Sequence, residues 1–201
     1  MKSLYSFIVT PLSDRYNNKK KIGDKTLIIN TTIENHRFVS KEAVVVSVPA
    51  AYSSQIKKGD KVYVHHNLFR RWYDQKGREK NSSTYFKDNL YFCSPSQLYA
   101  YEDNKKIKCN WNYCFVSPIK NNNFLSTRKE QTNIGILKYS NKSLEALGLK
   151  PGDLVTFTPN SEFEFVIRGE RLYCMKSNDI ALIHEHKGNE KKYNPSWAQG
   201  S

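Results

Sequence analysis

The amino-acid sequence predicts an all-β chain made of two tandem copies of one small β-barrel, with long loops and little helix. Three blocks of sequence occur twice in the same order, and the chain between them consists largely of short apolar runs separated by turn residues. Short strands with regularly spaced turns are typical of small barrels and sandwiches. The repeated blocks are 9–12 with 116–119, 56–64 with 149–157, and 90–98 with 172–180.

The spacing of these blocks predicts the domain organisation. The first block recurs after 107 positions, the second after 93 and the third after 82, so the first copy has 14 additional residues before its second block and 11 more after it. Insertions between repeated strands belong to loops, which carry function more often than scaffolds do. The expected parts are a first barrel over 1–104, a linker over 105–112, a second barrel over 113–186 and a C-terminal tail over 187–201.

Each copy is expected to form its strands in the same order. In the first copy an apolar run at 6–9 precedes 43–48, which is dense in β-branched residues and ends at Pro49, because proline cannot donate to a ladder. The later strands of the first copy are expected at 61–65, after a Gly-Asp turn, and at 99–102, after a tight turn at 94–98. The second copy has expected strands at 113–116, 134–139, 154–158, 163–167, 172–175 and 181–184.

One turn of helix is expected at 143–148. Ser143 is suited to cap its start, and Gly148 would lie just past its end, where a left-handed backbone is common.

Composition limits the classes of protein to consider. No apolar run approaches the ~20 residues that span a bilayer, and the first residues show no secretory signal. We therefore expect a cytoplasmic protein with no membrane partner. The formal net charge of +13 is compatible with nucleic acid or with an acidic protein as partner.

No catalytic or metal-binding constellation is apparent. The sequence has no Gly-x-Ser-x-Gly, no phosphate-binding loop and no His-x-x-x-His. Its four cysteines, Cys93, Cys109, Cys114 and Cys174, form no Cys-x-x-Cys pair and are expected to be buried free thiols rather than zinc ligands. We therefore expect no enzyme, no cofactor and no metal site.

The motifs resemble those of GroES-type co-chaperonins, the chaperonin-10 family. The stretch 11–15, Pro-Leu-Ser-Asp-Arg, resembles the opening of that family, and the Gly-Asp strands at 59–64 and 152–157 resemble its central strand. The close of the family, a leucine followed by Asp-Ile-x-Ala-Ile, has its counterpart at Leu172 and 179–183. The resemblance covers 6–186 as two tandem, diverged units. It implies an irregular β-barrel that assembles into a ring and caps a chaperonin.

The family binds its chaperonin through a mobile loop that carries an apolar tripeptide. The matching loop here is 18–40, and the tripeptide is Leu27-Ile28-Ile29. A loop that becomes ordered on binding loses entropy, which keeps its affinity moderate and its release feasible. The alternative is that the same three residues form an ordinary strand of the barrel. A second, shorter loop at 120–133 offers Phe124 and Leu125 as apolar anchors.

Basic and aromatic residues alternate in the surplus of the first copy, within 67–86. One interpretation is a nucleic-acid contact in which aromatic rings stack on bases. We favour the other, a long hairpin whose aromatic rings pack on the barrel or on a neighbouring subunit, because interfaces are enriched in Trp, Tyr and Arg. The candidate interface residues are Phe69, Arg70, Arg71, Trp72 and Tyr73.

The C-terminal tail contains Tyr193 and Trp197 in an otherwise polar stretch. Large aromatic rings are unfavourable in water, so we expect the tail to dock on its own chain or on a neighbour, and we favour another subunit as the partner.

Three functions are compatible with these features. The first is a co-chaperonin that binds the apical domains of a GroEL-type chaperonin as a homo-oligomeric ring and assists ATP-dependent folding. The high Lys, Asn and Tyr content and the absence of a roof hairpin resemble bacteriophage versions, which implies a host-cytoplasmic location and a capsid protein as client. The second is a phage virion structural or assembly protein that reuses the barrel. The third, and least favoured, is a nucleic-acid-binding module.

Overall fold

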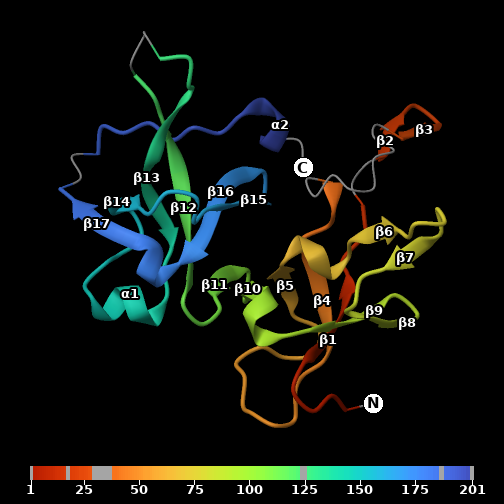
Figure 1. Ribbon diagram of the computed structural model, residues 1–201. Coiled ribbons are helices and arrows are strands. Elements are labelled where there is room, and N and C mark those ends of the chain that lie inside the picture. Colours follow the sequence, from red (N-terminus) through yellow and green to blue (C-terminus); the bar gives the residue numbers. More distant parts are fainter. Residues whose placement is uncertain (1, 17–18, 29–37, 123–125, 186–187, 200–201) are drawn as a thin grey trace. The chain divides into compact units, whose positions relative to one another are not determined.

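The computed structural model describes residues 2–16, 19–28, 38–122, 126–185 and 188–199, and it divides the chain into two compact units (Figure 1). The first unit is Met1–Lys105 and the second is Lys106–Ser201. Each unit is built around antiparallel β-sheet, so the expected all-β class is confirmed.

Within the first unit, the strands of the larger sheet follow the order β10-β5-β4-β1-β9-β8. Two further hairpins, β2–β3 and β6–β7, pair only within themselves among the described residues. The strands are β1 (Phe7–Pro11), β2 (Lys19–Ile22), β3 (Lys25–Ile28), β4 (Glu42–Ser47), β5 (Lys61–Val64), β6 (Arg71–Tyr73), β7 (Glu79–Asn81), β8 (Tyr85–Lys87), β9 (Leu90–Cys93) and β10 (Leu98–Asp103), with 3-10 turns η2 (His66–Leu68) and η3 (Pro95–Gln97).

The sheet of the second unit has the order β15-β16-β12-β13-β14-β17. Its strands are β12 (Tyr113–Lys120), β13 (Glu130–Tyr139), β14 (Leu154–Phe157), β15 (Phe163–Ile167), β16 (Glu170–Lys176) and β17 (Ile180–His184). The unit also contains β11 (Lys106–Cys109), the short helices α1 (Lys142–Ala146) and α2 (Ser196–Gln199), and the 3-10 turn η4 (Ser177–Asp179). The stretch expected as a linker therefore includes a strand.

The two sheets have the same strand order. Replacing β1, β4, β5, β8, β9 and β10 by β12, β13, β14, β15, β16 and β17 converts one into the other. The register agrees as well: Val9 lies opposite Val45 and Tyr91, and its counterpart Val116 lies opposite Leu137 and Tyr173. The sequence repeat thus corresponds to a repeat of structure.

Neither sheet is closed into a barrel by the pairings of the described strands. The first sheet has no pairing between β8 and β10, and the second has none between β15 and β17. Closure requires the two edge strands to meet with matching tilt and stagger. The pairings of the described strands thus show two antiparallel sheets of equivalent topology, and they do not confirm the expected pair of β-barrels.

The repeated Gly-Asp turn explains why this dipeptide occurs in both copies. Gly59 and Gly152 have φ values of +93° and +106°, a conformation that glycine adopts without steric penalty. The carboxylates of Asp60 and Asp153 then accept hydrogen bonds of 2.7 Å from the backbone N–H groups of Lys57 and Lys150. These bonds close the turn that leads into β5 and β14.

Each unit has its own apolar core. The core of the first unit includes Phe7, Val9, Val45, Val62, Phe69, Tyr91 and Leu98. The core of the second includes Val116, Leu137, Leu144, Val155, Phe157 and Met175. Cys93, Cys114 and Cys174 are buried free thiols, as expected, whereas Cys109 is partly exposed.

The expected helix is present but begins one residue earlier than predicted. Asn141, rather than Ser143, caps α1, because its side chain accepts a hydrogen bond of 3.1 Å from the backbone N–H of Leu144. Gly148 follows the helix with φ of +87°, as its predicted position requires.

Candidate binding surfaces

The expected mobile loop lies between β1 and β4, where the chain forms the small hairpin β2–β3. The connection from β1 to β4 spans 12–41, whereas the equivalent connection from β12 to β13 spans only 121–129. Gly23, with φ of +59°, and Asp24 form the turn of the hairpin. The hairpin is therefore specific to the first copy.

Part of the apolar tripeptide is described. Leu27 lies in β3 opposite Lys20, and its side chain is 53% exposed. Ile28 ends β3, and Ile29 lies outside the described residues. The two described residues of the tripeptide form a strand, whereas the alternative placed all three in a strand of the barrel. The observed strand belongs to the separate hairpin and not to the main sheet of the first unit.

The second, shorter loop carries two further candidates. Phe124 and Leu125 lie outside the described residues.

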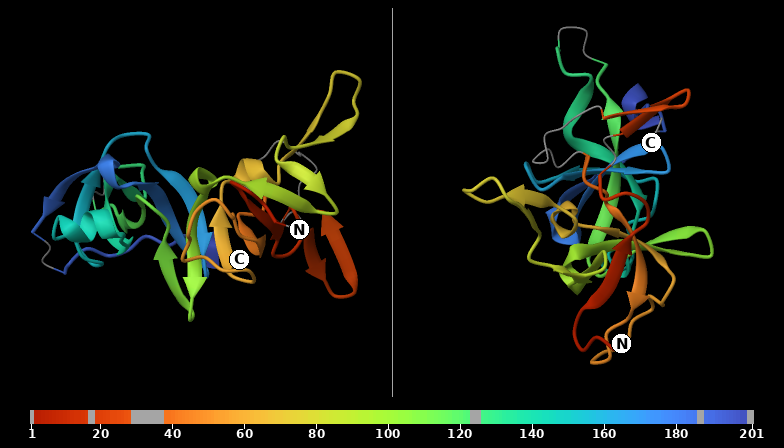
Figure 2. Two further views of the ribbon diagram at one scale, coloured as in Figure 1. Left: turned by 90° about the horizontal axis from the view of Figure 1, so that it is seen from below. Right: turned by 90° about the vertical axis from the view of Figure 1, so that its right-hand side faces the viewer.

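The aromatic surplus of the first copy forms the hairpin β6–β7 (Figure 2). Phe69, one of the candidate interface residues, is fully buried and packs edge-on against Tyr91 with ring centroids 4.8 Å apart. It therefore belongs to the core of the first unit. Trp72 and Tyr73, in contrast, are 48% and 52% exposed. Both rings are therefore exposed on the surface rather than packed in the core of the first unit.

Arg15 and Tyr16, which follow β1 in the chain, hold the base of this hairpin. The guanidinium group of Arg15 donates from Nε and Nη2 to the carbonyl of Phe69, and from Nη1 to the side-chain oxygen of Asn81 at 2.8 Å. The backbone N–H of Arg71 donates to the hydroxyl of Tyr16 at 2.8 Å, and the Arg71 guanidinium lies 4.6 Å from the centre of the Tyr16 ring. The hairpin therefore has a fixed base.

The C-terminal tail docks on the second unit. The backbone N–H of Tyr193 donates to the carbonyl of Pro118 at 2.8 Å, and that of Lys120 donates to the carbonyl of Lys191 at 2.7 Å. The guanidinium carbon of Arg171 lies 6.0 Å from the centre of the Trp197 ring. The described contacts of the tail are with its own unit, whereas the sequence favoured another subunit as the partner.

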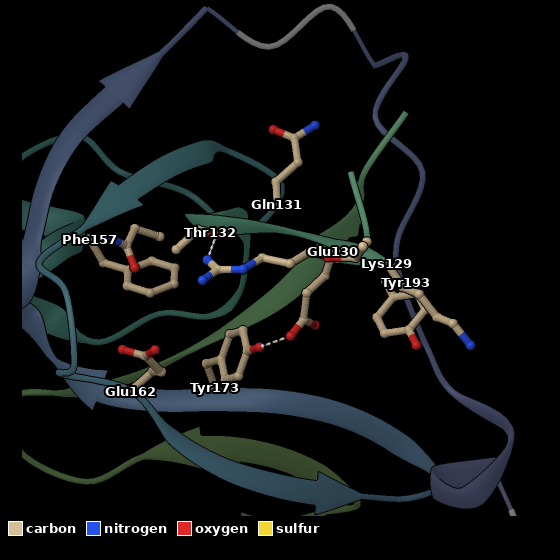
Figure 3. Close-up of a pocket in the computed structure, with 11 residues that line it drawn as sticks. Lys129, Glu130, Gln131, Thr132, Phe157, Glu162, Tyr173 and Tyr193 are labelled. Carbon is tan, nitrogen blue, oxygen red and sulfur yellow. Dashed lines mark hydrogen bonds between the residues drawn. The ribbon is translucent and has the colours of Figure 1, made fainter. Parts of the chain in front are cut away.

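A cavity of about 540 Å³ lies beside this tail in the second unit (Figure 3). Tyr193 and Tyr173 line it together with Glu130, and the Tyr173 hydroxyl donates to the Glu130 carboxylate at 2.8 Å. Burial, followed by this hydrogen bond, raises the pKa of Tyr173 well above its usual value. Arg128 also lines the cavity, with Nη1 donating to the Thr132 hydroxyl at 2.8 Å.

Arg171 connects the walls of this region. Its side chain is only 10% exposed and forms ion pairs with Glu130 and Glu164. The hydrogen bonds to the two carboxylates raise the pKa of Arg171 although burial acts in the opposite direction. Sequence analysis did not single out Arg171 or Glu130, because 41 positions separate them and no motif contains both.

Features of other functional classes are lacking in the described parts of the chain. No group of three or more His, Cys, Asp or Glu side chains there could hold a metal ion. No helix among these residues is long and apolar enough to cross a membrane. Comparison with protein families gives no matching family model, and a search of curated proteins gives no match.

Proposed function

We propose that the protein is a co-chaperonin that caps a GroEL-type chaperonin and assists ATP-dependent protein folding. One observation carries the proposal: a hairpin with an exposed apolar residue, Leu27, interrupts the first copy of a strand order that occurs twice. The resemblance of the sequence motifs to GroES-type proteins implies a chaperonin-binding loop in this connection. The hairpin is the part of the first unit that the repeated scaffold does not need.

The physical chemistry of the hairpin suits a reversible anchor. Leu27 exposes 53% of its surface, so apolar area is available to be buried by a partner. Fully burying a side chain of this size contributes roughly 1.5–3 kcal/mol. A two-stranded hairpin is at best marginally stable by itself, and ordering it on binding would offset part of this gain. The result is moderate affinity, which allows release in each nucleotide cycle.

The remaining assignments follow from this proposal. The protein acts as a homo-oligomeric ring without catalytic activity, in the cytoplasm of a bacterial host if a phage encodes it, with a capsid protein as client. The alternative role, a virion structural or assembly protein, relied on a tail that links subunits. The described tail contacts lie within the second unit, so we favour the co-chaperonin.

The experiment is a pull-down with purified GroEL-type chaperonin, with ATP, with ADP and without nucleotide. We expect retention that depends on nucleotide, and loss of at least tenfold in affinity when Leu27, Ile28 and Ile29 are all replaced by Ser. The matched control is Ile22→Ser, which removes an equally exposed apolar side chain from the same hairpin outside the tripeptide. Circular dichroism of each variant should be unchanged.

Two outcomes would contradict the proposal. Retention that is independent of nucleotide and survives the triple substitution would show that the tripeptide is not the anchor. An equal loss for Ile22→Ser would show that the hairpin acts as a general apolar surface rather than through the tripeptide.

A further inference from the structure

The connection that contains the hairpin β6–β7 differs in charge between the two copies. It spans 65–89 in the first unit and 158–169 in the second, between strands that occupy equivalent places in the two sheets. From 65 to 89 the first copy has six Lys and Arg and three Asp and Glu, whereas 158–169 contains Glu162, Glu164 and Arg168. The scaffold therefore does not require the basic character of the first copy.

Strand pairing places a tryptophan and basic side chains on one face of this hairpin. Trp72 lies directly opposite Lys80, and residues opposite each other in an antiparallel pair project to the same face. The next pair on this face toward the tip is Asp74 with Arg78, joined by a backbone hydrogen bond of 3.0 Å. Lys80 Nζ lies 3.8 Å from the Asp74 carboxylate, which agrees with a shared face. We name Trp72, Arg78 and Lys80 the basic-aromatic face.

The carboxylate on this face is largely occupied. Asp74 Oδ1 accepts hydrogen bonds of 2.9 Å from the backbone N–H groups of Lys76 and Arg78, which hold the tip of the hairpin. Glu79, the other acidic residue of the hairpin, lies opposite Tyr73 on the other face and pairs with Arg71 at 3.2 Å. On this face the two positive charges of Arg78 and Lys80 therefore exceed the single negative charge of Asp74.

The indole ring of Trp72 is available for contact. Its Nε1–H donates to the carbonyl of Asn81 at 3.2 Å, so the polar edge of the ring already has a partner. The ring is nevertheless 48% exposed. The surface offered to a ligand is mainly apolar ring, which suits stacking better than hydrogen bonding. The anchored root described above keeps this ring in place before any ligand binds.

We propose that the basic-aromatic face binds single-stranded nucleic acid, with Trp72 stacking on a base and Arg78 and Lys80 contacting the flanking phosphates. Aromatic platforms beside cationic side chains are how proteins bind single strands without sequence preference. A double helix keeps its bases stacked on each other and offers no free base to Trp72. This activity is independent of chaperonin binding, which we assign to the other hairpin.

The neighbouring hairpin β8–β9 extends the same chemistry. Phe86 and Phe92 are 40% and 39% exposed, and their ring centroids lie 5.1 Å apart. Lys87 Nζ lies 5.5 Å from the centre of the Phe86 ring. A second stacking platform with its own cation therefore follows the first along the chain.

The test is fluorescence anisotropy of a labelled oligo-deoxythymidine of about 20 nucleotides, titrated with the full chain. Stacking contributes 1–3 kcal/mol per base, so Trp72→Ala should weaken binding roughly 5- to 150-fold. Each lost phosphate contact lowers the slope of log affinity against log salt by about 0.7 for single strands, so R78A with K80A should lower it by about 1.4.

Matched controls separate this site from the general positive charge of the chain. Trp111→Ala removes another exposed tryptophan, one that is 69% exposed. Substituting Lys142 and Lys150 together by Ala changes the net charge as much as R78A with K80A does, on exposed positions of the second unit. Both controls should bind within about twofold of the original chain.

Three results would overturn the proposal. The first is absence of binding at about 50 mM salt, where electrostatic contacts are strong. The second is an equal loss in the Lys142 and Lys150 control. The third is binding of poly-glutamate as tight as binding of the oligonucleotide, with no effect of Trp72→Ala, which would identify an acidic protein surface as the partner.

Discussion

Asn194 accepts, on its side-chain oxygen, a hydrogen bond of 3.0 Å from the backbone N–H of Arg171. Its side-chain nitrogen donates at 2.9 Å to the carbonyl of Gly169 in the same turn. One side chain of the C-terminal tail thus joins the tail to the turn between β15 and β16. The buried Ala198 lies in the helix that follows.

Asn194→Ala should therefore lower the stability of the second unit. The substitution leaves a backbone N–H and a carbonyl without partners in a partly buried place, which costs about 1–3 kcal/mol for each group that water does not reach. Urea unfolding followed by circular dichroism measures the effect. Gln199→Ala is the control, because it removes a single exposed hydrogen bond of 3.2 Å to the carbonyl of Asn194. An Asn194 variant no less stable than this control would mean that the two hydrogen bonds of this side chain contribute nothing.

Gly135 is a second position where a small change should have a large effect. A Cβ atom at Gly135 would lie 2.6 Å from the backbone oxygen of Ser117, and backbone cannot move aside cheaply. We expect Gly135→Ala to destabilise the second unit by about 1–3 kcal/mol, the usual range for overpacking. The equivalent position of the first copy, opposite Pro11, is the buried Ala43. Thermal unfolding of Gly135→Ala that matches the original chain would contradict this geometry.

The repeat of the fold was predictable because β-pairing keeps register over long distances. The blocks containing Val9 and Tyr91 recur at Val116 and Tyr173 with different offsets, and the two pairs nevertheless lie opposite each other in their sheets. Closure was not predictable, because it depends on edge strands whose partners no local pattern specifies. The shift of the cap from Ser143 to Asn141 is a local choice between two suitable residues.

The candidate surfaces were predicted in part. Apolar and aromatic runs in the additional segments of the first copy predicted Leu27 and Trp72 as binding residues, and both are exposed. Phe69 belongs to the same run but turns inward, because η2 breaks the alternation of a strand just before it. The role of Arg15 depends on a contact across 54 positions, and a single sequence carries no sign of it.

The buried thiols make stability depend on pH. Burial raises the pKa of the Cys93 thiol from 9.0 to about 12, so between these values the unfolded chain releases a proton that the folded chain retains. The stabilisation is complete below pH 9.0 and is lost as pH rises toward about 12. The expected loss is about 1.4 kcal/mol per pH unit for each such thiol.

Urea unfolding at about pH 8 and about pH 10.5 measures this loss. Cys93→Ala should reduce the pH dependence of the stability of the first unit. The free energy of unfolding of this variant at about pH 8, compared with that of the original chain, gives the separate packing cost of the substitution. Burial also raises the pKa of Cys114 to about 12, so Cys114→Ala should have the same effect on the second unit. A pH dependence that neither substitution changes would assign it to other groups.

Arg15 should hold the hairpin β6–β7 in place without being required for the fold of the first unit. Its guanidinium fork binds the carbonyl of Phe69 and the side chain of Asn81, and an ammonium group cannot make both contacts with the same geometry. We therefore expect Arg15→Lys to leave circular dichroism unchanged while the hairpin opens more often. Cleavage of the native protein by trypsin after Lys76 and Arg78 should become several-fold faster, because proteolysis follows the population of the open state.

Arg128→Lys, which alters an exposed arginine of the second unit, is the control and should leave cleavage at these two sites unchanged. Equal cleavage rates in the original chain and the Arg15→Lys variant would show that the hairpin does not depend on this anchor.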